Sequence, residues 1–304
     1  MRKPLLGALL AVLLLGAGAA PATATGLDAV APAKTSPIAP IAPSGARVGT
    51  TAPDGTGVAV KAVSYAGTVA LSNCSGSVVR TPGSQPNDFA LVLSNGHCIE
   101  SGFPAAGQVI VNQPSTRSFT LLNAAGTGVA TLRASKIAYA TMTDTDVSLY
   151  QLTSTYAQIQ SRYAITALDL NTTRPVQGTA IKVVSGYWKR IYTCNVDGFA
   201  YQLKEGQWTW KDSVRYTSAC NTIGGTSGSP VIDNTTGKVV AVNNTGNESG
   251  GRCTDNNPCE VDQNGTVTVR QGINYAQETY QIVPCVGTGT TINLSLPGCT
   301  LPKP

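Results

Sequence analysis

The chain has 304 residues, of which 12% are charged and 42% are hydrophobic, and its formal net charge is +5. The net charge falls to +3 when the two cations Arg2 and Lys3 are removed. The remaining Lys and Arg residues form no basic stripe, so nucleic acid is not an expected partner. Few charges beside abundant Gly, Ser, Thr and Asn are typical of a compact secreted β protein.

The N-terminus has the pattern of a secretory signal. Arg2 and Lys3 precede an apolar run from Leu5 to Leu15, and small residues follow up to Ala24. This order predicts a signal peptide over residues 1–24 that is cleaved after Ala24. The apolar run is shorter than the roughly 20 residues that a membrane helix needs. We therefore expect a secreted, extracellular protein with no membrane partner after signal removal.

Residues 25–57 are rich in Pro and Ala and predict an extended linker or pro-segment. From Val58 onward, short β-branched runs alternate with turn residues, which predicts an all-β unit of one or two β-barrels. The expected strands are Val58–Ser72, Gly76–Arg80, Phe89–Leu93, Gln108–Asn112, Phe119–Leu122, Val129–Ala140, Val147–Leu152, Ala180–Gly186, Lys189–Val196, Phe199–Leu203, Ser213–Tyr216, Pro230–Ile232, Val239–Asn243 and Thr266–Arg270.

Eight cysteines in a chain bound for an oxidising compartment predict disulfides. Zinc-site spacing is absent, because no Cys-x-x-Cys pair occurs and the chain has one histidine, so we expect no metal. Many pairings remain possible from the count alone. Sequence order suggests the pairs Cys74 with Cys98, Cys194 with Cys220, Cys253 with Cys259, and Cys285 with Cys299.

The single histidine, His97, follows the apolar run that ends at Leu93, so any histidine chemistry must use it. Ser227 lies later, between Gly225-Thr226 and Gly228-Ser229-Pro230. A serine needs a general base to become a nucleophile at neutral pH. The sequence therefore pairs His97 with Ser227.

Two aspartates between them are candidates for the group that orients the histidine. Asp146 leads directly into the apolar strand at Val147, where it can be buried, whereas Asp144 belongs to a Thr/Asp loop typical of solvated turns. We choose Asp146. An α/β-hydrolase needs Gly-x-Ser-x-Gly and a later histidine, and a subtilisin-type order needs the aspartate before the histidine, so both alternatives fit the chain poorly.

Three segments together resemble the motifs of the chymotrypsin-like serine peptidases: Asn95 to Cys98, Asp146 to Leu149, and Gly225 to Pro230. The resemblance covers about Val58 to Cys285. It is strongest to the bacterial secreted branch similar to glutamyl endopeptidases, because Gly224 to Val231 follows that branch's Gly-Gly-x-Ser-Gly-Ser-Pro-Val.

The resemblance implies two packed six-stranded antiparallel β-barrels over residues 58–286, with a short C-terminal helix or tail. It also implies a triad in which Ser227 attacks a carbonyl, His97 transfers the proton and Asp146 holds the imidazole. The backbone amides of Gly225 and Ser227 would then form the oxyanion hole.

The chain departs from its relatives in the specificity pocket. Asn221 stands six positions before the serine, where trypsin-like enzymes have an aspartate, and Asn243 stands where glutamyl-specific relatives have a second histidine. We expect Asn221, Thr222, Asn243 and Asn244 to form a neutral polar pocket. Thr226 carries no charge to pair with a freed N-terminal amine, so we expect no electrostatic activation switch.

The last segments carry weaker patterns. Oxygen ligands are dense from Asp255 to Asp262, but the spacing of an EF-hand is missing, which favours a solvated loop closed by Cys253 and Cys259. Ile273 to Tyr280 is the candidate for a late helix. Residues 287–304 are expected to form a tail held by the disulfide of Cys285 and Cys299.

Taken together, the sequence predicts a secreted, monomeric serine endopeptidase that acts on protein or peptide substrates and uses no cofactor. The alternative is a catalytically inactive homologue that acts as a secreted binding or regulatory protein. The intact set of His97, Asp146, Ser227 and Gly225 favours the enzyme.

Overall fold

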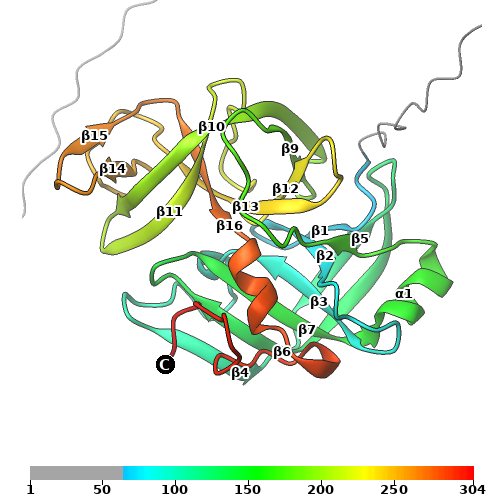
Figure 1. Cartoon of the computed structure of the whole chain (residues 1–304). Coiled ribbons are helices and arrows are strands. Elements are labelled where there is room, and N and C mark those ends of the chain that lie inside the picture. The colour runs from blue at the N-terminus through cyan, green and yellow to red at the C-terminus, as the bar shows by residue number, and fades with distance from the viewer. Residues whose placement is uncertain (1–63) are drawn as a thin grey trace, which may run out of the picture. The chain divides into compact units, whose positions relative to one another are not determined.

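The computed structural model describes residues 64–304, which form two β-barrels with few helices (Figure 1). The expected signal peptide (1–24), the linker (25–57) and the first part of the strand expected from Val58 to Ser72 lie outside the described residues. Within the described part, no helix is both long and apolar enough to span a bilayer.

The first barrel closes through six strands in the hydrogen-bonded order β1-β5-β6-β7-β3-β2, because β2 pairs again with β1. β4 adds to β6, and β8 runs parallel to β2. The strands are β1 (Thr68–Ala70), β2 (Ser75–Arg80), β3 (Phe89–Ser94), β4 (Val109–Pro114), β5 (Ser118–Leu122), β6 (Gly128–Thr141), β7 (Val147–Thr155) and β8 (Leu168–Asp169).

The second barrel closes in the order β11-β16-β13-β12-β9-β10, because β10 also pairs with β11. β14 and β15 extend this sheet beyond β10. The strands are β9 (Ala180–Ser185), β10 (Arg190–Glu205), β11 (Trp208–Tyr216), β12 (Pro230–Asp233), β13 (Val239–Gly246), β14 (Cys259–Val261), β15 (Val267–Val269) and β16 (Asn274–Glu278). The expected all-β fold of two six-stranded antiparallel barrels is confirmed.

Each barrel has its own apolar interior. Phe119 and Leu121 of β5, two positions apart, are fully buried in the first barrel together with Ile137. In the second barrel, Ile181 and Val183 of β9 follow the same two-residue period. This period places alternate side chains of a strand on the inner face of the sheet.

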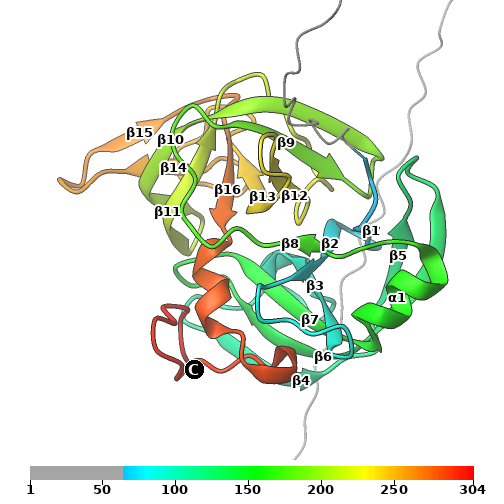
Figure 2. The same cartoon turned by 45° about the vertical axis from the view of Figure 1, so that its right-hand side comes forward.

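The C-terminal segment packs into a third apolar cluster, which joins the two barrels. It contains Leu91 of β3, Val242 of β13, and Ile292 and Leu301 of the C-terminal segment. The Tyr139 hydroxyl also donates a hydrogen bond to the Pro302 carbonyl over 3.0 Å. Figure 2 shows this segment, in red, against the first barrel. Residues 287–304 are therefore part of a core as well as tethered by a disulfide.

Two expected elements differ from the structure. The late helix at Ile273 to Tyr280 is wrong, because this segment contains β16, whose five residues are all buried. The strands expected at Lys189–Val196 and Phe199–Leu203 form the single strand β10, which has an irregularity between Val196 and Gly198. Asp197 is the extra, unpartnered residue of this bulge, after which the strand continues in a shifted register.

The structure contains four disulfides, and they join the pairs that sequence order suggests. Cys74–Cys98 connects the residue before β2 to the turn that carries His97. Cys253–Cys259 closes a short loop beside the tip of the β10–β11 hairpin, where the Gly206 amide donates to the Cys253 carbonyl.

Candidate active site

His97 lies in a short 3₁₀ helix (Gly96–Cys98) that directly follows β3. A Cβ atom at Gly96 would lie 2.1 Å from the Thr141 carbonyl oxygen, so only glycine allows this close approach to β6. The Asn95 side-chain amide donates to the Asp146 carbonyl over 2.7 Å, and Cys98 is fixed by its disulfide. The backbone around His97 is therefore held from both sides.

Asp146 contacts His97 at two points. Its Oδ2 lies 2.6 Å from the His97 ring Nδ1, and its Oδ1 accepts the His97 backbone N–H over 3.0 Å. The Asp146 side chain is completely buried, whereas the ring of His97 is partly exposed. A carboxylate on Nδ1 selects the tautomer that carries its proton there, which leaves Nε2 as the acceptor.

The surroundings of His97 raise its pKa above the ordinary value of 6.5. Burial alone would lower the pKa, because it disfavours the charged imidazolium. The negative charge of Asp146, the hydrogen bond from Asp146 and the more distant charge of Glu205 together outweigh this effect. The imidazolium that forms when His97 accepts a proton is therefore stabilised within the site.

Asp144, the competing aspartate, has a different environment. It has a φ of 59° in the loop before β7, and its half-exposed carboxylate pairs with the Lys211 ammonium over 2.7 Å. The structure therefore brings Asp146 to His97 and gives Asp144 a surface ion pair.

Ser227 lies in the turn between β11 and β12, which docks onto the first barrel. The Ser75 amide at the start of β2 donates to the Ser227 carbonyl over 2.7 Å, and the Ser75 hydroxyl donates to the Gly225 carbonyl over 3.2 Å. Gly228 has a φ of 81°, and a Cβ atom there would lie 2.0 Å from the Ser75 carbonyl oxygen. The turn can approach β2 this closely only with glycine at this position.

Two backbone amides of the turn that carries Ser227 have no acceptor among the described residues. The amides of Thr226 and Gly228 donate to the carbonyls of Ile223 and Asn243, but those of Gly225 and Ser227 donate to no acceptor within residues 64–304. Gly225 has a φ of 85°, a conformation that favours glycine. Free amides of a serine and of the residue two positions before it can bind a developing oxyanion.

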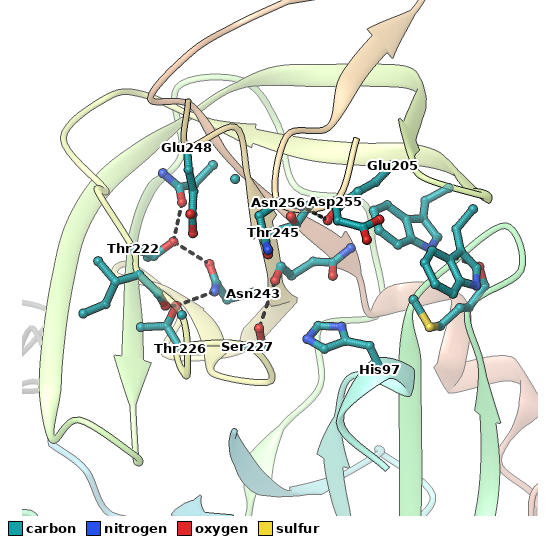
Figure 3. A pocket seen from close by; sticks show the side chains of 18 of the residues that line it. His97, Glu205, Thr222, Thr226, Ser227, Asn243, Thr245, Glu248, Asp255 and Asn256 are labelled. Atoms are coloured by element: carbon teal, nitrogen blue, oxygen red, sulfur yellow. Dashed lines mark hydrogen bonds between the residues drawn. The ribbon is translucent and has the colours of Figure 1, made fainter. Parts of the chain in front are cut away.

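The Ser227 hydroxyl donates to the Asn244 carbonyl over 3.1 Å, and no hydrogen bond joins it to His97 in the described part of the chain. Both side chains nevertheless line one cleft of about 210 Å³ and face the same space (Figure 3). Nucleophile-to-base hydrogen bonds are often loose without a ligand and tighten in the substrate complex.

A polar network lines the cleft on one side of Ser227. The Thr222 hydroxyl donates to Asn274 Oδ1 over 2.7 Å, and the Asn243 amide donates to the Thr226 hydroxyl over 3.1 Å. Three of the four expected pocket residues, Thr222, Asn243 and Asn244, line the cleft, whereas the exposed Asn221 does not. The sequence did not indicate Asn274, because β12 to β15 and their connecting loops separate it from the serine motif.

Aromatic and acidic side chains that no sequence motif indicated line the other side of the cleft. Apart from Phe103, which follows His97 by six positions, they come from segments distant from the triad motifs, and no local pattern connects them to the site. The aromatic residues are Phe103, Trp208 and Trp210, and the acidic residues are Glu205 and Asp255, whereas Glu248 lies on the Thr222 side of the cleft (Figure 3).

The candidate metal-ligating groups have other partners. The sulfur atoms of Cys74 and Cys98, which lie near His97, are bonded to each other and offer no thiolate. In the segment from Asp255 to Asp262, where oxygen ligands are dense, Glu260 pairs with Arg215 and Arg270, and Asp262 accepts backbone amides.

Comparison with solved structures finds proteases of similar fold at low identity. The active form of the Rv3671c protease from M. tuberculosis is 14% identical with a TM-score of 0.45, over 91% of this chain and 97% of that chain. The thermostable serine protease AL20 from an extremophilic microorganism is 15% identical with a TM-score of 0.40, over 71% and 91% of the two chains. A Nocardiopsis protease is 11% identical with a TM-score of 0.40, over 71% and 92%.

A comparison with curated proteins gives no match. The family model of the trypsin-like peptidase domain, in contrast, matches residues 74–242, which are more than half of the chain. This segment contains His97, Asp146 and Ser227, and it extends from the first disulfide to the middle of β13. The chain therefore belongs to the trypsin-like peptidase domain family.

Proposed function

We propose that the protein is a secreted serine endopeptidase in which His97, Asp146 and Ser227 act as a catalytic triad. The observation that carries the proposal is the two-point contact of Asp146 with His97, in the cleft that also holds Ser227 and its unpaired amides. Four disulfides are compatible with an extracellular location.

The proposed reaction proceeds through an acyl-enzyme. The Ser227 hydroxyl oxygen attacks the peptide carbonyl carbon while His97 Nε2 takes the hydroxyl proton. The amides of Gly225 and Ser227 stabilise the resulting oxyanion. The C–N bond then breaks as His97 returns the proton to the leaving amine. A water molecule, deprotonated by His97, attacks the ester and releases the carboxylic acid and Ser227.

The uncharged network of Thr222, Thr226 and Asn243 beside Ser227 supports a polar pocket for the side chain next to the cleaved bond, and Glu248 is the one carboxylate labelled on this side of the cleft (Figure 3). Asn243 occupies the place of the histidine expected of a glutamyl-specific enzyme, and its amide is already engaged by Tyr216 and Thr226. We therefore do not extend the proposal to glutamyl specificity.

One observation favours the alternative of an inactive binding protein: the Ser227 hydroxyl is bonded to the Asn244 carbonyl rather than to His97. The two functions make opposite predictions for covalent chemistry at Ser227. Only an activated serine reacts rapidly with a fluorophosphonate.

The test is fluorophosphonate labelling of the secreted, disulfide-intact protein, followed by peptide hydrolysis assays. The wild type should be labelled and Ser227→Ala should not, and kcat should fall by about 10⁶-fold in that variant. Folded wild-type protein that is neither labelled nor active would support the binding protein instead.

A further inference from the structure

Glu205 and Asp255 reach the cleft from two segments that are docked on each other. Glu205 ends β10, and Asp255 lies in the loop closed by Cys253–Cys259. The Asn256 amide donates to Glu205 Oε1 over 2.7 Å. A Cβ atom on Gly206 would lie 2.7 Å from Asp255 Oδ1, so the loop packs directly on the hairpin tip. The Glu205 carboxylate is therefore held by a backbone amide, and the exposed Asp255 carboxylate lies against the hairpin tip.

The charge of these two carboxylates is not compensated. No Lys or Arg lines the cleft, and within residues 64–304 neither Glu205 nor Asp255 forms an ion pair. Glu205 Oε2 is buried without a hydrogen-bond partner among the described residues. Burial raises the pKa of Glu205 above its ordinary value of 4.5. A buried carboxylate of this kind is stabilised by a cation that brings its own N–H donors.

Asn244 gives an independent indication of a ligand. Its side chain is 3% exposed and lines the same cleft, yet neither its amide nitrogen nor its amide oxygen has a partner in the described structure. Buried polar groups are nearly always paired, and an unpaired one costs free energy. The amide oxygen of Asn244 is therefore a further acceptor available to a bound donor.

Aromatic rings extend from His97 along this side of the cleft. The ring centroids of His97 and Phe103 are 5.7 Å apart, and those of Phe103 and Trp208 are 5.8 Å apart. The Trp208 indole N–H donates to the Pro104 carbonyl over 2.9 Å, which fixes the ring. Lys and Arg side chains combine an apolar stem with a charged end, so they match an aromatic wall that leads to carboxylates.

Figure 3 shows Glu205 and Asp255 on the His97 side of the cleft and Thr222 on the other side of Ser227. We propose that Glu205, Asp255 and Asn244 form a second substrate subsite, which binds a Lys or Arg side chain of the peptide. The residue next to the cleaved bond uses the Thr222 pocket, and the cation belongs to a different residue of the same substrate. This inference rests on the proposed peptidase function.

The test measures kcat/KM for peptides that carry Lys or Arg at one position at a time, against the same peptides with norleucine or Gln. The wild type should prefer the cation at one position by tenfold or more, the size expected for a hydrogen bond to a charged group. Glu205→Gln and Asp255→Asn should each reduce this preference several-fold. Gln keeps an acceptor for the Asn256 amide, so the loop stays docked.

Two further variants serve as controls. Asp169→Asn removes an equal charge from an exposed ion pair with Arg80 in the first barrel, and it should leave the cation preference unchanged. Glu248→Gln removes the third carboxylate of the cleft. A preference lost only in Glu248→Gln would overturn the assignment to Glu205 and Asp255.

The remaining outcomes separate this inference from the proposed function. A wild type that is labelled by the fluorophosphonate and cleaves peptides, but prefers a cation at no position, overturns the subsite and leaves the peptidase intact. A folded wild type that is neither labelled nor active overturns the peptidase and the substrate subsite together.

Discussion

At the scale of single residues, the site depends on how firmly His97 is oriented. Asp146 uses both carboxylate oxygens on His97, one on the ring and one on the backbone amide. Each of these hydrogen bonds would contribute little free energy in water. The carboxylate is fully buried, however, so its charge acts in a low dielectric and both bonds are stronger. The orientation of the imidazole is therefore set before substrate binds.

The first prediction concerns Asp146→Asn. The Asn amide group can donate toward the His97 ring and favour the wrong tautomer, so we expect kcat to fall by about 10⁴-fold while the fold is kept. Steady-state kinetics on a peptide substrate measures this loss. Asp144→Asn is the matched control, because Asp144 pairs with Lys211 at the surface, and it should change kcat by less than about twofold. Equal losses in both variants would contradict the assignment of Asp146.

The second prediction concerns pH. Neutral His97 is the active base, so kcat/KM should rise with pH through a pKa above 6.5. Asp146 and Glu205 both contribute negative charge that stabilises the imidazolium. Removing one of these charges in Glu205→Gln should shift the midpoint of the profile to lower pH. A midpoint that stays in place or moves upward would show that Glu205 does not act on His97.

Residue identities near the triad could be predicted because each belongs to a short local pattern. Asp146 was separable from Asp144 because only Asp146 leads directly into a buried strand. Asn221 shows the limit of that reasoning. It stands six positions before Ser227, as a pocket residue would, but its side chain is exposed and lies outside the cleft. Glu205 and Asp255 could not be found, because only tertiary packing brings them together.

At the scale of elements, α1 (Tyr156–Tyr163) shows how a short helix is stabilised by its first residues. The Thr155 hydroxyl accepts the Gln158 amide over 3.2 Å, and the Gln158 side chain accepts the Thr155 amide over 3.0 Å. This capping box satisfies two amides that a helix of eight residues leaves free at its start.

The third prediction follows from this cap. Thr155→Ala should lower the free energy of unfolding by about 1 kcal/mol, because the Gln158 amide loses its acceptor. Urea denaturation of the purified protein measures the change. Thr172→Ala, in an exposed loop, serves as the control and should have an effect below about 0.5 kcal/mol. Indistinguishable midpoints for the two variants would mean that the cap is dispensable.

The sequence contains the Thr-x-x-Gln capping signal at the start of α1, so this helix could be predicted from local residues. The strand β16 could not be predicted in this way. Its polar residues are spaced like the polar face of a helix. In the barrel, however, each of them forms a hydrogen bond with a distant residue: Asn274 with Thr222, Gln277 with Ser213, and Glu278 with Arg174. A buried strand whose polar side chains are paired by distant residues has no local signature.

At the scale of the whole molecule, the C-terminal segment contributes to the packing of both barrels. Ile292 and Leu301 join a cluster with residues of β3 and β13. The sequence predicted a tethered tail, because the segment is rich in Gly, Thr and Pro and its few apolar residues follow no regular period. Only the surfaces of the two barrels define where those apolar residues pack.

The fourth prediction concerns this packing. Leu301→Ala should lower the free energy of unfolding by about 3 kcal/mol, although Leu301 lies close to the end of the chain, because the side chain is almost fully buried. Thermal or urea denaturation measures the loss. Lys303→Ala removes an exposed side chain two residues later and should have little effect. A loss below about 0.5 kcal/mol for Leu301→Ala would show that the segment is peripheral.

The two barrels meet at Cys74 and Ser75, and this has a consequence for motion. Cys74 is bonded to the neighbour of His97, and Ser75 holds the backbone of Gly225 and Ser227. The two reacting groups, although they belong to different barrels, are thus anchored to two adjacent residues, Cys74 and the first residue of β2. When the barrels shift against each other, base and nucleophile are carried in the same direction. The gap between them should therefore fluctuate less than the barrels that enclose it.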